Sequence, residues 1–142
     1  MDKPKVLVID DEEIVRLSCI RTLQPEGYDV KVVQSGIEGL KVIEKEAFDL
    51  VLTDLKMPDM DGIEVLKRVK EGWPDTEIIV ITGYGTVGSA VQAMKFGAFD
   101  YLEKPFTPDQ LLLVVSRSLE KKRFIIDNIQ SAQKSISLYR LE

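Results

Sequence analysis

The chain has 142 residues, 44% hydrophobic and 30% charged, which is typical of a single globular domain. A net charge of -5 argues against a nucleic-acid surface, and the absence of histidine removes the commonest general base and transition-metal ligand. No apolar stretch approaches the roughly 20 residues that span a bilayer, and no signal-peptide pattern opens the chain, so we expect a cytoplasmic protein that contacts neither membrane nor nucleic acid directly.

Short apolar runs alternate along the chain with patterns of helical periodicity. The runs, predicted to be strands, cover residues 6–9, 28–33, 50–52, 78–81 and 99–102. Helices are predicted over residues 12–24, from 35 onward, over 63–70 and 86–96, and from 107 onward. Thr107 and Pro108 suit the start of the last helix as its N-cap and first-turn proline. Strands that alternate with helices in this way indicate right-handed crossovers and a parallel sheet.

The single cysteine, Cys19, falls within the first helical pattern, beside Leu17 and Ile20. One cysteine cannot form an internal disulfide. We therefore expect a small buried or half-buried side chain rather than a reactive thiol.

Four of the predicted strands end in residues suited to phosphate or metal chemistry. These residues are Asp10 and Asp11, Asp54, Thr82, and Lys104. The carboxyl ends of parallel strands line one edge of the sheet, so three carboxylates, a hydroxyl and an ammonium should meet there. Clustered carboxylates repel one another unless a cation offsets them, and oxygen ligands alone suit Mg²⁺ or Mn²⁺. The sequence thus predicts a site for a divalent cation and a phosphoryl group.

Within this site, Asp54 is the predicted nucleophile, because a carboxylate can attack phosphorus to form an acyl phosphate. Lys104 offers a compact positive charge to phosphoryl oxygens, and the Thr82 hydroxyl could donate a hydrogen bond to one of them. Blander interpretations remain open: Asp10 and Asp11 could cap the following helix, and a lone lysine at a strand end is usually solvated. The Lys104–Pro105 bond is a candidate cis peptide.

With these residues in place, the chain resembles a response-regulator receiver domain of two-component signalling, from residue 4 to about residue 122. Four segments carry the resemblance in order: VIDDE at 8–12, TDLKMPDMDG at 53–62, ITGYG at 81–85 and YLEKPF at 101–106. The resemblance implies a flavodoxin-like (βα)5 α/β fold with strand order 2-1-3-4-5. It also implies a signalling switch in which Asp54 accepts a phosphoryl group from a histidine kinase.

The same resemblance assigns roles to the remaining site residues. It implies that Mg²⁺ is held by Asp11, Asp54 and the backbone carbonyl of Lys56, with Asp10 contacting the ion through water. Thr82 would be the switch hydroxyl, Lys104 the phosphate-binding lysine, and Tyr101 an aromatic residue that turns inward on activation.

Segments 82–86 and 90–101 look like the receivers of sigma-54-type transcriptional activators. Those proteins carry an ATPase and a DNA-binding module downstream, and we find neither here, because the chain has no Gly-x-x-x-x-Gly-Lys-Ser/Thr phosphate loop. We therefore expect regulation of transcription through parts that lie outside this chain.

We divide the chain into a receiver domain, residues 1–122, and a helical extension or linker, residues 123–142. The extension has a heptad stripe made of Ile125, Ile129, Ala132, Ile136 and Tyr139. It is predicted to extend the last helix and form a dimer seam. The alternatives are a linker that packs on a downstream domain, and a cloning remnant at Leu141–Glu142.

Two other classes of function compete with the switch. A Mg²⁺-dependent aspartyl phosphohydrolase or phosphotransferase could use the same aspartate, but a haloacid-dehalogenase-type enzyme needs a general acid two residues later, where this chain has Lys56. A flavin or dinucleotide binder would need a Gly-x-Gly-x-x-Gly turn after the first strand, which is absent. We expect at most self-phosphorylation and self-dephosphorylation.

Overall fold

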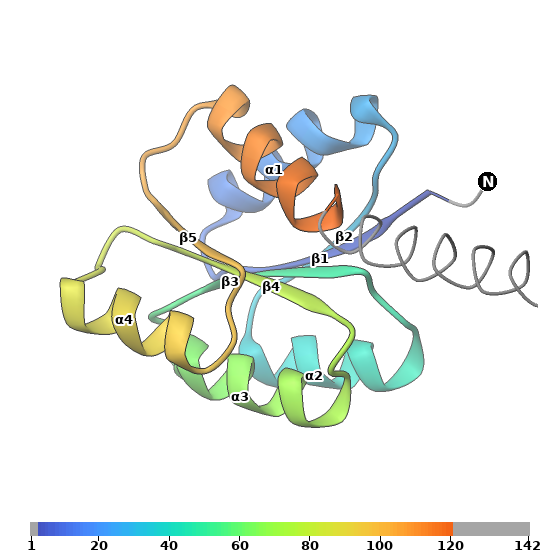
Figure 1. The fold of residues 1–142 in the computed structure, drawn as a ribbon. Coiled ribbons are helices and arrows are strands. Elements are labelled where there is room, and N and C mark those ends of the chain that lie inside the picture. Colours follow the sequence, from blue (N-terminus) through green and yellow to red (C-terminus); the bar gives the residue numbers. More distant parts are fainter. Residues whose placement is uncertain (1–2, 121–142) are drawn as a thin grey trace, which may run out of the picture.

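A computed structural model describes residues 3–120 as a parallel sheet covered by helices on both faces (Figure 1). The strands are β1 (Lys5–Ile9), β2 (Asp29–Val33), β3 (Leu50–Asp54), β4 (Glu77–Thr82) and β5 (Asp100–Glu103). They pair in the order β2-β1-β3-β4-β5, every pair parallel. The predicted fold class and strand order are confirmed.

The helices lie close to their predicted positions. They are α1 (Glu13–Leu23), α2 (Gly36–Lys45), α3 (Gly62–Gly72), α4 (Val87–Lys95) and a last helix described over residues 108–120, with a 3-10 turn at Gln24–Glu26. The helix predicted over 63–70 is longer at both ends. It begins where the Asp61 side chain accepts a hydrogen bond from the Ile63 N–H at 2.7 Å, and it closes with Trp73 N–H on the Val69 carbonyl at 2.7 Å.

Two separate apolar layers fill the space between sheet and helices. In Figure 1, α1 and the helix over 108–120 cover one face of the sheet, and α2, α3 and α4 cover the other. Successive residues of a strand point to opposite faces. Leu7 and Ile9 of β1 therefore pack toward α2 and α3, and Val6 and Val8 pack toward α1 and the last helix. A strand buried on both faces is apolar throughout, which is why β1 has no polar alternation.

The helices are anchored to this core to very different degrees. Five residues of α3 are buried, whereas α4 buries only Ala93. The outer side of α4 leaves Val87, Val91 and Met94 exposed at one-turn spacing. A Thr86–Ser89 capping box fixes the start of this helix, and Thr107 caps the last helix as predicted, accepting from the Gln110 N–H at 3.1 Å.

The buried position predicted for Cys19 is confirmed. The side chain is fully buried, and burial is the main cause that raises the pKa of its thiol to about 12. We expect no labelling of the native protein by a thiol reagent at pH 8, and full labelling in denaturant. The folded chain keeps this proton where the unfolded chain loses it, so the associated stability is present below about pH 9 and is lost as the pH rises toward 12. Rapid labelling under native conditions would contradict the assignment.

Several sequence predictions fall outside the described part of the chain. The heptad stripe after residue 122, the dimer seam and the domain boundary at that residue all depend on residues 121–142, so they remain predictions. Within residues 3–120, no helix is both long enough and apolar enough to cross a membrane.

Candidate functional site

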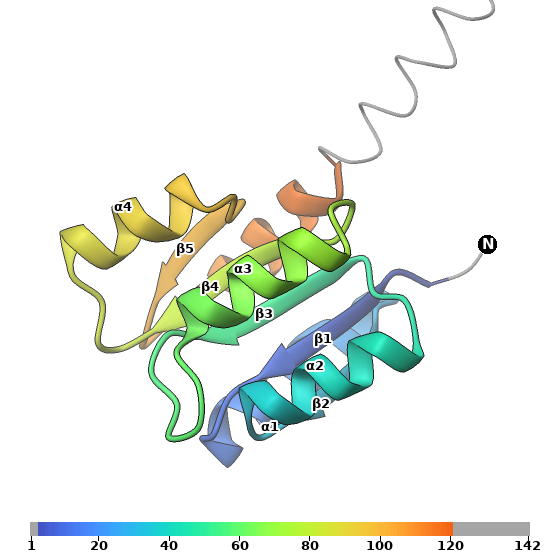
Figure 2. The same cartoon turned by 90° about the horizontal axis from the view of Figure 1, so that it is seen from below.

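The predicted site residues gather at the carboxyl edge of the sheet. In Figure 2 the arrowheads of the central strands point to this edge, where the loops into α1, α3 and α4 begin. The β1–β3 register pairs Ile9 with Thr53, so the next residues along, Asp10 and Asp54, are neighbours. Thr82 is the last residue of β4 and pairs with Glu103 of β5. Lys104 is the residue after Glu103. Strand order thus brings together residues that lie far apart in sequence.

The acidic residues form one compact cluster. One carboxylate oxygen from each of four residues lies within 4.8 Å of the other three: Asp10, Asp11, Glu12 and Asp54. Asp10 and Asp54 are almost completely buried, at 0% and 1% exposed, while Asp11 and Glu12 are exposed. Buried carboxylates are unfavourable unless charges or hydrogen bonds compensate them, so this arrangement indicates a compensating cation.

Lys104 supplies part of that compensation. Its Nζ atom lies 2.9 Å from Asp10 Oδ2, 2.9 Å from Glu12 Oε1 and 3.1 Å from Asp54 Oδ2. The backbone N–H of Lys104 donates to the Thr82 carbonyl at 2.9 Å, which fixes the start of the loop after β5. The Lys104–Pro105 peptide is cis. One ammonium therefore serves three carboxylates and cannot neutralise them all.

The electrostatics of the site follow from this shortage of positive charge. Burial raises the pKa of Asp10, and the Glu12 N–H and the Lys104 ammonium offset the rise only in part. Burial alone would lower the pKa of Lys104, but its contacts with Asp10 and Glu12 and the charge of Asp54 outweigh burial and raise it well above the usual value. Lys104 therefore remains a cation at any physiological pH.

Two buried oxygens at this site lack a hydrogen-bond donor among the residues that the structure describes: Asp10 Oδ2 and Asp54 Oδ1. Lys104 Nζ is near Asp10 Oδ2 but does not meet hydrogen-bond geometry, so we regard that contact as an ion pair only. Buried polar atoms are rarely left without partners. Unpartnered oxygens within a purely carboxylate donor set fit a hard divalent cation such as Mg²⁺.

The turn from β1 into α1 bears on the capping alternative for Asp10 and Asp11. Asp10 Oδ1 accepts from the Glu12 N–H at 2.9 Å, and the N-cap residue, Glu12, forms no side-chain capping bond. Asp10 thus shapes the turn before the helix rather than capping its first turn. Its second carboxylate oxygen, Oδ2, faces the Lys104 ammonium at 2.9 Å and accepts no hydrogen bond from the described residues.

The loop from β3 to α3 is packed against the central aspartate. Gly62 N–H donates to the Leu55 carbonyl at 2.7 Å, and a Cβ at Gly62 would collide with the carbonyl oxygen of Asp54. Only glycine allows α3 to start this close to the end of β3. The loop is consequently held against the strand that carries Asp54.

The predicted switch residues meet at the loop between β4 and α4. The buried Thr82 hydroxyl accepts from the Tyr84 N–H at 3.1 Å. The Tyr101 hydroxyl lies 3.3 Å from Ser89 Oγ, and the Tyr101 ring fills the space where a Cβ at Gly85 would stand. Thr82 and Tyr101 therefore contact neighbouring residues of one short loop, Tyr84 and Gly85.

Two residues of this site are not predicted by the sequence patterns. Glu12 shares Lys104 with the aspartates, and its place directly after the acid pair was a usable signal. Arg16 donates from Nη1 to the Asp10 carbonyl at 2.8 Å. Nothing in the periodicity of α1 distinguishes this arginine from a solvated one.

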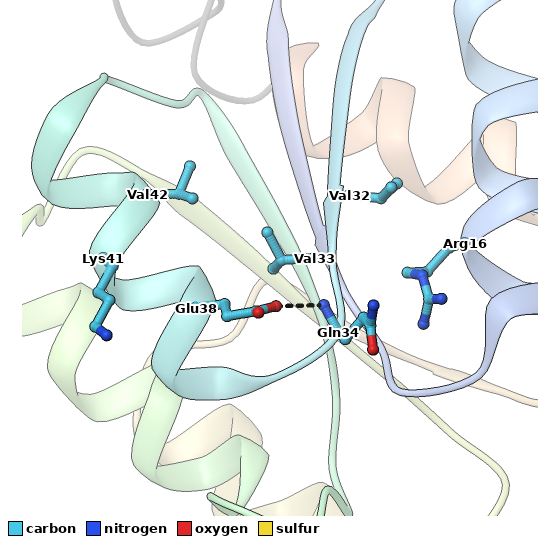
Figure 3. Close-up of a pocket in the computed structure, with 7 residues that line it drawn as sticks. All are labelled: Arg16, Val32, Val33, Gln34, Glu38, Lys41 and Val42. Carbon is cyan, nitrogen blue, oxygen red and sulfur yellow. Dashed lines mark hydrogen bonds between the residues drawn. The ribbon is translucent and has the colours of Figure 1, made fainter.

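A hollow beside this site shares one residue with it, Arg16. It sits over the end of β2 between α1 and α2, and Figure 3 shows Glu38 accepting a hydrogen bond from the Gln34 N–H at 3.2 Å. Its lining is Arg16, Val32, Val33, Gln34, Glu38, Lys41 and Val42. Since none of the clustered carboxylates lines it, we place the functional site at the acidic edge.

Comparison with known proteins agrees with this geometry. The model of the response regulator receiver domain family matches residues 6–116. The chain belongs to this family, whose members act as signalling switches rather than as classical enzymes.

Particular relatives refine the assignment. A putative NtrX-like response regulator of Rickettsia typhi is 36% identical over 96% of this chain and 29% of its own length. The DNA-binding transcriptional regulator NtrC of Proteus hauseri is 37% identical over 87% of this chain and 26% of its own length. The solution structure of a beryllofluoride-activated NtrC4 receiver domain dimer has a TM-score of 0.80 and 40% identity, over 83% of this chain and 98% of the other.

The predicted kinship with receivers of sigma-54-type activators is confirmed by these relatives. The chain spans less than a third of the length of the curated relatives.

Proposed function

We propose that this domain is a phosphorylation-controlled switch in which Asp54 accepts a phosphoryl group from a sensor histidine kinase. The main support is the different surroundings of its two carboxylate oxygens. Oδ2 is paired with Lys104 at 3.1 Å, and Oδ1 is buried beside the other acids without a donor among the described residues. One oxygen is thus oriented by a cation while the other is available as a nucleophile.

In the proposed transfer, an Asp54 oxygen forms a bond to phosphorus while the phosphorus–nitrogen bond of the donor histidine breaks, and the imidazole leaves with the electron pair. Bound Mg²⁺, held by Asp11, Asp54 and the Lys56 carbonyl with Asp10 acting through water, would neutralise charge on the transferring oxygens. The Lys104 ammonium would pair with a phosphoryl oxygen.

Signal output would begin at Thr82. Its hydroxyl accepts from the Tyr84 N–H, which leaves its own hydrogen free to donate to a phosphoryl oxygen. A Thr82 side chain drawn toward Asp54 would pull the loop 83–85 with it through the bond from Tyr84. Tyr101 packs on the same loop and would follow it inward. The two states must differ by only a few kcal/mol for one phosphoryl group to shift their balance.

The proposal is tested by incubating the protein with a small acyl-phosphate donor and measuring intact mass. We expect one phosphoryl adduct per chain with Mg²⁺, and none with a chelator. An adduct that persists over many minutes supports a switch. Continuous release of phosphate with no adduct would instead support the alternative, an aspartyl phosphohydrolase or phosphotransferase.

We further propose that the domain forms a homodimer and controls transcription through an ATPase or DNA-binding domain in the rest of the protein. The exposed α4 residues Val87, Val91 and Met94 offer an apolar face, and a related receiver is a dimer when activated by beryllofluoride. A cytoplasmic location, where a kinase could reach the site, stays a prediction.

Beryllofluoride should therefore change the dimerisation of this protein, because it mimics the phosphoryl group that moves the loop before α4. Sedimentation at matched concentrations, with and without beryllofluoride, measures the change. The substitution Val91→Lys should abolish it, since Val91 is 61% exposed at the centre of the apolar face. An unchanged mass distribution for the unsubstituted protein would contradict the proposed output.

A further inference from the structure

The loop that follows Asp54 leads into α3 but is hydrogen-bonded to the start of α2. The Asp59 carboxylate accepts a hydrogen bond from the Ile37 N–H at 2.9 Å, and its other oxygen accepts from the Gly36 N–H at 3.4 Å. Gly36 and Ile37 are the first two residues of α2. Residues more than 20 positions apart are thereby joined at the edge of the acidic site.

Asp59 completes a cap that α2 already has in part. Ser35 Oγ accepts from the Glu38 N–H at 3.2 Å, and the Glu38 carboxylate accepts from the Gln34 N–H at 3.2 Å. This local motif leaves the first two N–H groups of the helix, those of Gly36 and Ile37, without intrahelical partners. Gly36 is buried, so Asp59 supplies its N–H with a partner, and the same two bonds hold the loop that carries Asp59.

Packing at the same place supports a close fit between loop and helix. A Cβ at Gly36 would lie 3.0 Å from Met60 Cβ and 3.0 Å from Val65 Cγ2. The residue next to Asp59 therefore presses directly on the start of α2. The loop is held there by two hydrogen bonds and by a steric contact with a helix that carries no group of the site.

Lys56 lies between this anchor and the end of β3. On one side, Leu55 is buried and receives the Gly62 N–H on its carbonyl. On the other side only Met57 and Pro58 separate Lys56 from Asp59, and proline restricts the backbone of that link. With both ends fixed, the short segment has little freedom to change the direction of the Lys56 carbonyl.

We propose that Asp59 is a positioning residue that holds the Lys56 carbonyl in place for the divalent cation, and that metal binding is thereby coupled to the start of α2. This inference rests on the proposed function, since that function supplies the role of the Lys56 carbonyl.

The first test is a calorimetric titration with Mg²⁺. Asp59→Ala should weaken binding on the order of fivefold, the factor that corresponds to one lost cap. Asp59→Asn should recover most of the affinity, because its amide oxygen can still accept a hydrogen bond from α2. If the asparagine variant binds as weakly as the alanine variant, loss of charge explains the effect and the proposal is overturned.

Ser35→Ala is the matched control, since it removes a cap from the same helix without touching the loop. It should leave Mg²⁺ affinity unchanged while costing stability, measured by urea unfolding alongside the other variants. An equal loss of affinity in Ser35→Ala would show that helix stability, rather than loop position, sets metal binding.

A second readout follows from the reciprocity of coupling. Saturating Mg²⁺ should slow hydrogen exchange of the Gly36 and Ile37 amides in the unsubstituted protein and have no effect on them in Asp59→Ala. If the exchange rates of these amides in the unsubstituted protein are the same with and without Mg²⁺, the coupling is refuted.

Failure of this inference can be told apart from failure of the proposed function. If the unsubstituted protein binds no Mg²⁺, the proposed function itself is wrong. If it binds Mg²⁺ and Asp11→Asn abolishes binding, while Asp59→Ala binds normally, the metal site stands and only the role of Asp59 is disproved.

Discussion

Replacing Asp54 with asparagine is expected to eliminate phosphorylation of this domain. The amide oxygen retains the size and polarity of the carboxylate oxygen but is too weak a nucleophile to attack phosphorus. Because Asp54 is 1% exposed and crowded by other acids, losing its charge should not lower stability in the absence of metal. Intact-mass measurement with an acyl-phosphate donor and Mg²⁺ should therefore show a folded protein without an adduct.

Asp75→Asn is the control for this experiment. Asp75 is exposed and lies in the turn before β4, at the end of the sheet opposite the acidic edge. This variant should be labelled as fully as the unsubstituted chain. A stoichiometric adduct on the Asp54→Asn protein would mean that another residue is the acceptor.

Adding one methyl group at Gly62 should have the largest effect on stability. A Cβ there would collide with the Asp54 carbonyl oxygen and lie 2.8 Å from Leu55 Cα. Both obstacles are backbone atoms, so no side-chain rotation can make room. We expect Gly62→Ala to lower the free energy of unfolding by about 1–3 kcal/mol, the usual cost of overpacking, and to slow phosphorylation by displacing Asp54.

The same helix offers a matched comparison at its other end. Gly72 is the last residue of α3, and a Cβ there would meet nothing within 4 Å. Gly72→Ala should be neutral or slightly stabilising, because alanine is the better helix former. Urea unfolding of both variants measures the difference. Equal stabilities would show that the close approach at Gly62 carries no energetic weight.

Residue patterns predict this fold well because the three central strands are short apolar runs and the crossovers have a helical period. They also predict most of the site. Asp10, Asp54, Thr82 and Lys104 each stand at or just past a strand end, so the strand order alone makes them neighbours. No contact between side chains had to be known for that inference.

Other parts of the site depend on side-chain geometry that periodicity does not encode. The bond from Arg16 to the Asp10 carbonyl depends on where a long flexible side chain turns after leaving α1. The bonds from α2 to Asp59 depend on the path of an irregular loop. Each joins a polar side chain to a backbone group, and sequence patterns describe such pairs poorly because either partner could be solvated instead.

The uneven anchoring of the helices has a mechanical consequence. Helix α3 buries five residues in the core, and moving it would open that packing, whereas α4 buries only Ala93. Elements with few buried contacts are the first to shift when a protein is perturbed. A change in charge at the acidic edge should therefore move α4 first. The sheet and α3 should stay in place and keep the residues of the site in their positions.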